Sequence, residues 1–190
     1  LLVVSGLSGA GKGTIVNRLL QKHPDDYVLS FSATTRKPRE GEEDGREYFF
    51  KTENEFENMI AAGELLEHAC YVGNYYGTPK KWVKDKLSKN KNVILEIEVQ
   101  GAFQIRNIIP DAILVFIEPP SMEELRRRLA GRGTESEEDI DARIARAQEE
   151  LELKGRYDYI IVNEIVENSV DLLHNIVSVN KEIRSEERNI

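Results

Sequence analysis

The sequence predicts an α/β protein in which a central parallel sheet of five strands is flanked by helices, with an inserted mixed α+β subdomain and a helical lid. Three features of the 190 residues predict this architecture. Short apolar segments rich in β-branched residues recur along the chain, stretches with helical spacing separate several of them, and two long polar segments interrupt the alternation.

Five apolar segments are the expected strands of the central sheet, because each is short and bounded by polar residues. They comprise residues 1–5, 27–31, 93–97, 112–117 and 157–162. The expected helices comprise residues 14–22, 53–62, 79–88, 122–130 and a C-terminal stretch within 166–190. Pro24 ends the first of these helices. A chain of this length suits a single domain built around one core.

Two polar segments break the alternation of strands and helices. Residues 32–76 contain strand-like pieces at 48–50 and 65–71, which predict an inserted antiparallel subdomain. Residues 121–151 predict a hinged lid that carries the arginines Arg126, Arg127, Arg128, Arg132, Arg143 and Arg146. We therefore divide the single domain 1–190 into a core, an insertion and a lid. The core comprises 1–31, 80–120 and 152–190, the insertion 32–79, and the lid 121–151.

The composition argues against several function classes. The 34 acidic and 26 basic residues leave a net charge of -8, so the chain lacks a general field that would attract nucleic acid or an anionic membrane. Its longest uninterrupted apolar run, 112–117, is far shorter than the ~20 residues of a membrane-spanning helix. Residues 1–4 lack the flank and length of a signal peptide. A single cysteine, Cys70, excludes an intrachain disulfide and fits a cytoplasmic protein.

A glycine-rich loop follows the first expected strand and opens the first expected helix. It comprises Gly6, Leu7, Ser8, Gly9, Ala10, Gly11, Lys12, Gly13 and Thr14. Glycines let consecutive backbone N–H groups point into one concavity, the helix adds its positive end, and Lys12 adds a full charge. The alternative, a soluble turn without a ligand, explains neither the spacing nor the context. The loop therefore predicts a nucleoside triphosphate site of the P-loop type.

Gly13 departs from the usual form of this loop, in which Ser or Thr follows the lysine and contacts magnesium. Here the hydroxyl comes one residue later, on Thr14, where it can still bond a phosphate oxygen. We therefore expect Mg²⁺ to rest mainly on phosphate oxygens and water, with Thr14 peripheral. The sequence leaves the protein ligands of the metal open.

A second set of residues predicts another phosphate site. Arg36 and Arg39 stand three residues apart beside Ser32, and Tyr48 follows with a further hydroxyl. The guanidinium fork matches phosphate oxygens two at a time. A solvated basic turn is the alternative for this segment taken alone. Together with the triphosphate loop, the segment indicates a phosphoryl acceptor.

Glu67 and Thr78 suggest the base of that acceptor. A carboxylate accepts two parallel hydrogen bonds, and guanine is the common purine with two adjacent N–H donors on its Watson–Crick edge. Thr78 can donate to the guanine carbonyl, and Tyr76 can pack around the nucleotide. An unpaired buried polar group costs about 1–3 kcal/mol, so one carboxylate can discriminate between purines. Taken alone, Glu67 would more often be a surface acid.

Other polar residues admit simpler interpretations. Glu96 and Glu98 lie at the C-terminal end of their strand, where ligands of open α/β sheets bind. The acidic stretch 135–141 is interpreted as helix capping and solvation in preference to a metal site. His23 and His174 are expected at the surface. Cys70 is expected in ordinary packing, although His68 would share its face of a strand.

Taken together, these motifs resemble the guanylate kinase family, and the resemblance runs over essentially the whole chain. Its carriers are Gly6 to Lys12, Ser32 to Arg36 with Arg39, Asp44 to Phe50, Gly73 to Thr78, Leu95 to Gly101 and Gly131 to Thr134. The resemblance implies a P-loop NTPase fold with a GMP-binding insertion. It also implies an enzyme that transfers the γ-phosphoryl group of ATP to GMP, and to dGMP, with Mg²⁺ as cofactor in purine nucleotide metabolism.

The resemblance also implies roles for single residues. The family's GMP phosphate is held at the positions of Ser32, Arg36, Arg39 and Tyr48. Its guanine is read at the positions of Glu67 and Thr78, in a pocket that Tyr76 and Glu98 line. The implied catalytic residues are Lys12, Arg36, Arg132 and Arg143. Many members have aspartates at the positions of Glu96 and Glu98, so the contacts of these longer side chains are left open.

Two other functions compete with this interpretation. Relatives of guanylate kinase in scaffold proteins bind phosphopeptides without catalysis, but they typically lose parts of the ATP loop, whereas this chain keeps Lys12. A kinase for AMP, a pyrimidine monophosphate or a phosphorylated sugar is the second rival, and Glu67 argues against it. ATP and GMP are the expected partners, without nucleic acid or membrane, and the oligomeric state is left open.

Overall fold

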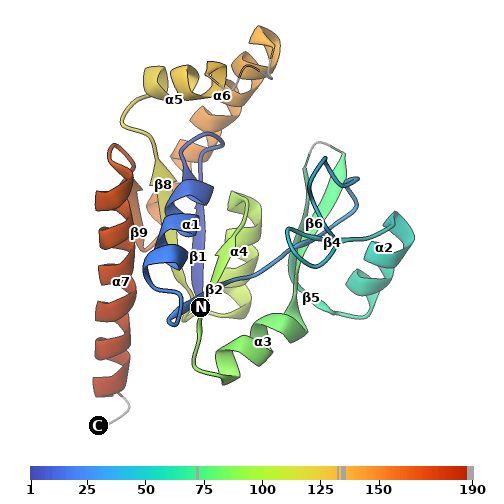
Figure 1. Ribbon diagram of the computed structural model, residues 1–190, viewed down its shortest axis with the longest axis vertical. Coiled ribbons are helices and arrows are strands. Elements are labelled where there is room, and N and C mark those ends of the chain that lie inside the picture. Colours follow the sequence, from blue (N-terminus) through green and yellow to red (C-terminus); the bar gives the residue numbers. More distant parts are fainter. Residues whose placement is uncertain (72, 132, 134–135, 188–190) are drawn as a thin grey trace.

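The central sheet of the computed structural model contains five parallel strands, as predicted from the sequence. Residues 1–71, 73–131, 133 and 136–187 are described here. The strands are β1 (Leu2–Gly6), β2 (Tyr27–Leu29), β7 (Asn92–Glu96), β8 (Ile113–Glu118) and β9 (Tyr159–Val162). Their order is β2-β7-β1-β8-β9, so β1 lies at the centre with every residue buried. The loop after β1 therefore leaves the sheet at its middle, at the C-terminal edge (Figure 1).

Helices cover this sheet and complete one hydrophobic core. They are α1 (Lys12–Lys22), α3 (Lys80–Ser88), α4 (Val99–Ile108), α5 (Met122–Ala130), α6 (Glu137–Glu152), the short η1 (Lys154–Arg156) and α7 (Val166–Glu187). α1 packs against α7, and α4 packs against β1 (Figure 1). α4 was not predicted, because Gly101 and its short apolar pattern weaken the helical signal that packing restores. No helix in the described part of the chain is long and apolar enough to cross a membrane.

The two histidines expected at the surface are partly buried instead, so that prediction is wrong. The rings of His23 and His174 stack between the end of α1 and α7, with centroids 3.9 Å apart and planes 3° apart. The hydroxyl of Tyr27 lies 3.0 Å from Nδ1 of His174. Burial, and then the neighbouring His23, lowers the pKa of His174. Sequence could not show this pairing because the two residues meet only through helix packing.

The inserted segment forms a second, four-stranded sheet beside one helix. Its elements are β3 (Ala33–Thr34), β4 (Phe49–Phe50), α2 (Glu53–Ala61), β5 (Leu65–Tyr71) and β6 (Asn74–Pro79), in the sheet order β4-β3-β6-β5. The expectation of a purely antiparallel subdomain is wrong for one pair, because β3 and β4 run parallel. The long excursion between them lets the chain return in the same direction. Figure 1 shows this sheet as a separate lobe beside the core.

One exposed residue of β5 differs from expectation. Cys70 is exposed, so its predicted place in ordinary packing is wrong, and His68 is exposed on the same strand. Both side chains are exposed because they lie on the solvent-facing side of an edge strand.

Among the residues described, no group of three or more His, Cys, Asp or Glu side chains could hold a metal ion.

The described part of the segment predicted as a lid contains two helices, which differ in how they are held. Leu125 and Leu129 of α5 are fully buried in the main core, so α5 is anchored to the sheet. Ser136 and Asp139 form a capping box at the start of α6, in whose first turn three acidic residues lie. The predicted site residue Arg132, and Thr134 of the Gly131 to Thr134 motif, lie outside the described residues.

Candidate active site

The glycine loop owes its shape to close contacts that exclude side chains. A β-carbon on Gly6 would lie 2.1 Å from the backbone oxygen of Ile117 in β8, and the φ of Gly6 is 130°. A β-carbon on Gly9 would lie 2.9 Å from the side chain of Leu129. Only glycine fits such positions without displacing backbone or core. The loop is thereby pressed against β8 and α5.

Two residues outside the loop hold its backbone. Nδ2 of Asn163, the residue after β9, donates to the carbonyl oxygen of Ala10 at 2.8 Å. Nη1 of Arg128 in α5 donates to the same oxygen at 3.3 Å, and its Nη2 donates to the backbone oxygen of Asn163 at 2.9 Å. Sequence reasoning missed Asn163, although a polar residue directly after a parallel strand is a usable signal.

Lys12 curls over the loop that precedes it. Its Nζ donates to the backbone oxygens of Gly6 at 2.7 Å and Leu7 at 3.0 Å. Gly11 is the N-cap of α1 and has a left-handed conformation, with no side-chain cap. The first N–H groups of α1 and the ammonium of Lys12 therefore occur at the same end of the helix, which is an arrangement suited to phosphate oxygens.

A half-buried carboxylate faces this helix start. The two carboxylate oxygens of Glu96, at the end of β7, lie 3.5 and 3.6 Å from the position that a β-carbon would take on Gly13. Burial raises the pKa of Glu96, and the charge of Lys12 acts in the opposite direction. Thr14 is exposed at the first turn of α1. Oxygen donors of this kind are the ligands that Mg²⁺ prefers, so these residues fit a metal bound with phosphates.

Two arginines of α6 reach the core. Nη1 of Arg143 donates to Oγ of Ser8 at 2.7 Å, so this predicted residue contacts the glycine loop. Arg146 joins Glu98 at 3.3 Å and Glu150 at 3.1 Å. Burial, and then the charge of Glu98, raises the pKa of Glu150. The sequence did not indicate the role of Glu150. Its burial depends on packing between chain segments, and its ion pair with Arg146 lies within a helix whose sequence gives no special signal.

Arg36 lies beside Tyr48, another of the predicted acceptor phosphate residues, and is paired with Glu42. Nη2 of Arg36 donates to both carboxylate oxygens of Glu42, at 2.8 and 2.9 Å, and the guanidinium carbon lies 5.3 Å from the ring centre of Tyr48. Glu42 also accepts the backbone N–H of Arg39 at 2.7 Å. The side chain of Arg39 is exposed, and Ser32 is partly buried. Glu42 was missed by sequence reasoning because acidic residues surround it on both sides.

Tyr48 connects this cluster with the rest of the site. Its ring lies 6.1 Å from that of Tyr76, centre to centre, in an edge arrangement. Burial is the main cause that raises the pKa of Tyr48, and the charge of Glu96 contributes to the rise. Glu96 of the core therefore acts electrostatically on a tyrosine of the insertion.

Glu67 and Thr78 are paired inside the insertion. Oγ1 of Thr78 donates to Oε1 of Glu67 at 2.6 Å, and both side chains are buried. Burial raises the pKa of Glu67 to about 7, against the effect of the hydrogen bonds from Thr78. Oε1 keeps a further lone pair after accepting from Thr78, so the two oxygens of the carboxylate together can still accept from paired N–H donors. The interpretation of Glu67 as a surface acid is therefore wrong.

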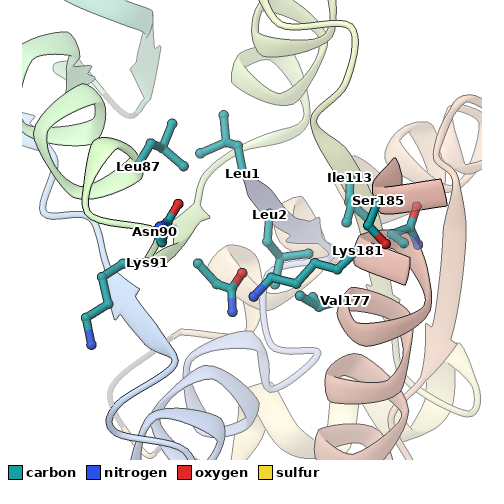
Figure 2. Close-up of a pocket in the computed structure, with 11 residues that line it drawn as sticks. Leu1, Leu2, Leu87, Asn90, Lys91, Ile113, Val177, Lys181 and Ser185 are labelled. Carbon is teal, nitrogen blue, oxygen red and sulfur yellow. The ribbon is translucent and has the colours of Figure 1, made fainter. Parts of the chain in front are cut away.

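A pocket of about 270 Å³ lies at the opposite edge of the central sheet (Figure 2). Leu1 and Leu2 at the start of β1, Ile113 at the start of β8 and Val177 of α7 line part of it. Because β1 and β8 are parallel, this edge is the N-terminal one, away from the glycine loop. Ligands of open α/β sheets bind at the C-terminal edge, so we do not assign this pocket to the site.

Comparisons with known proteins agree with this geometry. The family described as guanylate kinase matches residues 1–180. A guanylate kinase of Halalkalibacterium halodurans is 51% identical over 178 residues, which are 94% of this chain and 87% of that protein. A guanylate kinase of Lactococcus lactis subsp. lactis is 49% identical over 177 residues, 93% of this chain and 86% of that protein.

Solved structures give the same result. The crystal structure of guanylate kinase from Anaplasma phagocytophilum superposes with a TM-score of 0.77 at 37% identity, covering 94% of this chain and 84% of that one. A shikimate kinase from Bacteroides thetaiotaomicron has a TM-score of 0.51 at 18% identity, covering 93% of this chain and 97% of that one. The second likeness concerns the fold alone.

Proposed function

Because this chain belongs to the guanylate kinase family, we propose a role for each part of its site in the family's reaction, the phosphorylation of GMP by ATP. The chain is a nucleoside monophosphate kinase that forms ADP and GDP. The observation that carries the proposal is the buried pair of Glu67 and Thr78, because it supplies a base-reading group beside the phosphate-binding residues.

The glycine loop is the part of the site that binds ATP, the phosphoryl donor. Its backbone N–H groups and Lys12 hold the β- and γ-phosphates of ATP, since they offer positive charge at a helix start. ATP replaces the backbone oxygens of Gly6 and Leu7 as partners of the Lys12 ammonium. Asn163 and Arg128 keep the loop in the shape that the phosphates require.

The insertion is the part of the site that binds GMP, the phosphoryl acceptor. Arg36, Arg39, Ser32 and Tyr48 hold the GMP phosphate, with Arg36 presented by Glu42. The ionised Glu67 accepts the two N–H donors of guanine, and Thr78 meets the guanine carbonyl. Tyr76 and Glu98 line the same pocket. Adenine offers no adjacent pair of N–H donors, so an AMP kinase would leave the Glu67 carboxylate unpaired.

The transfer step needs positioning and charge neutralisation more than a general base. An oxygen of the GMP phosphate attacks the γ-phosphorus of ATP, and the bond from that phosphorus to the β–γ bridging oxygen breaks. Arg143, which contacts Ser8 of the loop, is proposed to neutralise the charge of the transferring group, and Arg132 is proposed for the same role. Exclusion of water around the closed site protects the phosphoryl group from hydrolysis.

Glu96 and Thr14 are the protein groups proposed to face Mg²⁺, whose charge, when it is bound with ATP, neutralises phosphate oxygens. Glu96 supports this role because its carboxylate faces the helix start at Gly13. We further propose that the enzyme accepts dGMP, serves purine nucleotide metabolism and acts in the cytoplasm.

A coupled assay of ADP formation tests the donor and acceptor assignments. Lys12→Ala and Arg36→Met are each expected to lower kcat/KM by about 100-fold or more, because each removes a charge-assisted contact to a phosphate. The exposed residues Lys89 and Arg18, which form ion pairs with Asp85 and Glu167, provide the matched controls Lys89→Ala and Arg18→Met. Unchanged rates in the site variants would overturn the assignments.

The same assay separates the rival functions. A scaffold module that binds phosphopeptides should turn over no ATP with GMP, whereas this chain keeps Lys12 and Arg143 at the loop. Preferred phosphorylation of AMP over GMP would overturn the role of Glu67.

A further inference from the structure

The position of the Glu67 carboxylate depends on a glycine in a core helix. A β-carbon on Gly101 of α4 would lie 2.5 Å from Oε2 and 3.1 Å from Cδ of Glu67. Gly101 is buried, as is Glu67. Contacts under 3.0 Å do not occur for real β-carbons, so any other residue at this position would push the carboxylate away. The carboxylate oxygen that does not accept from Thr78 thus occupies the space left by Gly101.

Glycine is otherwise a poor choice for this position. Gly101 is the third residue of α4 and has no positive φ that would require glycine. Glycine in a helix is unfavourable relative to alanine, because it loses more conformational freedom on folding. Close approach of another group is therefore the reason for glycine here, and that group is Glu67.

A second residue of α4 holds the same part of β5. Gln104, almost one turn after Gly101, accepts the backbone N–H of His68 at 3.1 Å and donates to the backbone oxygen of His68 at 2.8 Å. β5 is an edge strand of the inserted sheet. The side-chain amide of Gln104 therefore pairs with the strand edge next to Glu67, in the way that a neighbouring strand would.

We propose that Gly101 and Gln104 are positioning residues for base selection. They hold the Glu67 carboxylate where it meets the paired N–H donors of guanine, so the selectivity of the insertion depends on a helix of the core. The inference rests on the proposed role of Glu67. It adds that α4, which begins directly after Glu98, sets the geometry of guanine recognition from outside the inserted sheet.

Two substitutions test the proposal by kinetics with GMP and with IMP, which lacks the exocyclic amino group of guanine. Gly101→Ala and Gln104→Met should each raise the KM for GMP by roughly tenfold and reduce the preference for GMP over IMP. The KM for ATP should stay within about twofold, because both substitutions act on contacts with β5 of the insertion.

The chain offers matched controls for both changes. A β-carbon on Gly155 would meet no heavy atom within 4 Å, so Gly155→Ala applies the same substitution in open space. Gln100 is exposed on α4, so Gln100→Met applies the second substitution outside the contact. Both controls should keep the wild-type preference. Thermal unfolding identifies a variant that fails to fold. If Gly101→Ala does not fold, the result with Gln104→Met tests the proposal.

A double-mutant cycle with Glu67→Gln distinguishes positioning from general packing. If Gly101 acts through the carboxylate, Gly101→Ala should cause little further loss of GMP preference in the Glu67→Gln background. The inference would be overturned if Gly101→Ala reduced the preference for GMP equally in the wild-type and Glu67→Gln proteins. It would also be overturned if Gly101→Ala and Gln104→Met both folded and kept the wild-type preference for GMP over IMP. Unchanged GMP preference in Glu67→Gln alone would instead refute the proposed role of Glu67, so the two failures are distinguishable.

Discussion

The guanidinium of Arg36 donates through one nitrogen to both carboxylate oxygens of Glu42, at 2.8 and 2.9 Å. The contact lies within the insertion, above the ring of Tyr48. It lowers the pKa of Glu42, chiefly through the hydrogen bond from Arg36, so the carboxylate stays ionised in neutral solution. An arginine held in this way is oriented before a phosphate arrives, which reduces the ordering cost of binding.

Removal of Glu42 should therefore weaken GMP binding. We expect Glu42→Ala to raise the KM for GMP by about tenfold, with a smaller effect on kcat, because Arg36 loses its orientation but keeps its charge. Steady-state kinetics at saturating ATP measure the change. Glu43→Ala is the matched control, since Glu43 is exposed and pairs with Arg46. A lower KM in Glu42→Ala would show that Glu42 competes with GMP instead of presenting Arg36.

The affinity for GMP should depend on pH through Glu67. Burial raises the pKa of this carboxyl group to about 7, and only the ionised form accepts both N–H donors of guanine. The ionised fraction grows as pH rises through the pKa, so the KM for GMP should fall by roughly tenfold between about pH 6 and pH 8.

Glu67→Gln provides the reference for this pH profile. The GMP phosphate also titrates in this range, but its contribution is common to both proteins. The difference between the two profiles therefore reports Glu67 alone. Parallel profiles in wild type and Glu67→Gln would contradict the prediction.

Arg143 should affect the chemical step more than the binding of either substrate. It donates to Ser8 of the glycine loop, and we propose that it meets the transferring group when ATP is bound. Arg143→Met should lower kcat by about 100-fold with a change in either KM below about fivefold. The exposed Arg127, which pairs with Glu124, supplies the control Arg127→Met. A large rise in KM with unchanged kcat would place Arg143 in ground-state binding instead.

Asn163 should contribute to both stability and ATP binding. Its amide donates to Ala10 in the glycine loop and accepts from Oγ of Ser169 at 3.1 Å, and its side chain is buried. Asn163→Ala should lower the free energy of unfolding by about 1–3 kcal/mol, because buried polar groups lose their partner. Urea denaturation measures this loss.

The KM for ATP should rise in the same variant, since the loop is no longer braced. Asn107→Ala, at an exposed position of α4, should change neither quantity. An Asn163→Ala protein with lower stability but an unchanged KM for ATP would limit Asn163 to a purely structural role.

The order of the elements followed from local patterns, because burial and hydrogen bonding within a strand or helix act over short distances in sequence. The strand over Leu65–Tyr71 was predicted with the bounds that the structure has. The parallel pairing of β3 with β4 could not be predicted, since 14 residues separate Thr34 from Phe49 and their path is decided by tertiary contacts.

The sequence by itself determined the chemistry of this protein: a glycine loop with Lys12, a pair of arginines, and a carboxylate with a nearby hydroxyl. These signals are local, because each depends on residue types at close spacing. Only the tertiary structure decided what supports them. Asn163 meets Ala10, Arg143 meets Ser8, and Gly101 makes room for Glu67. Such partners lie far apart along the chain, and only the packing of helices onto two sheets brings them within contact distance.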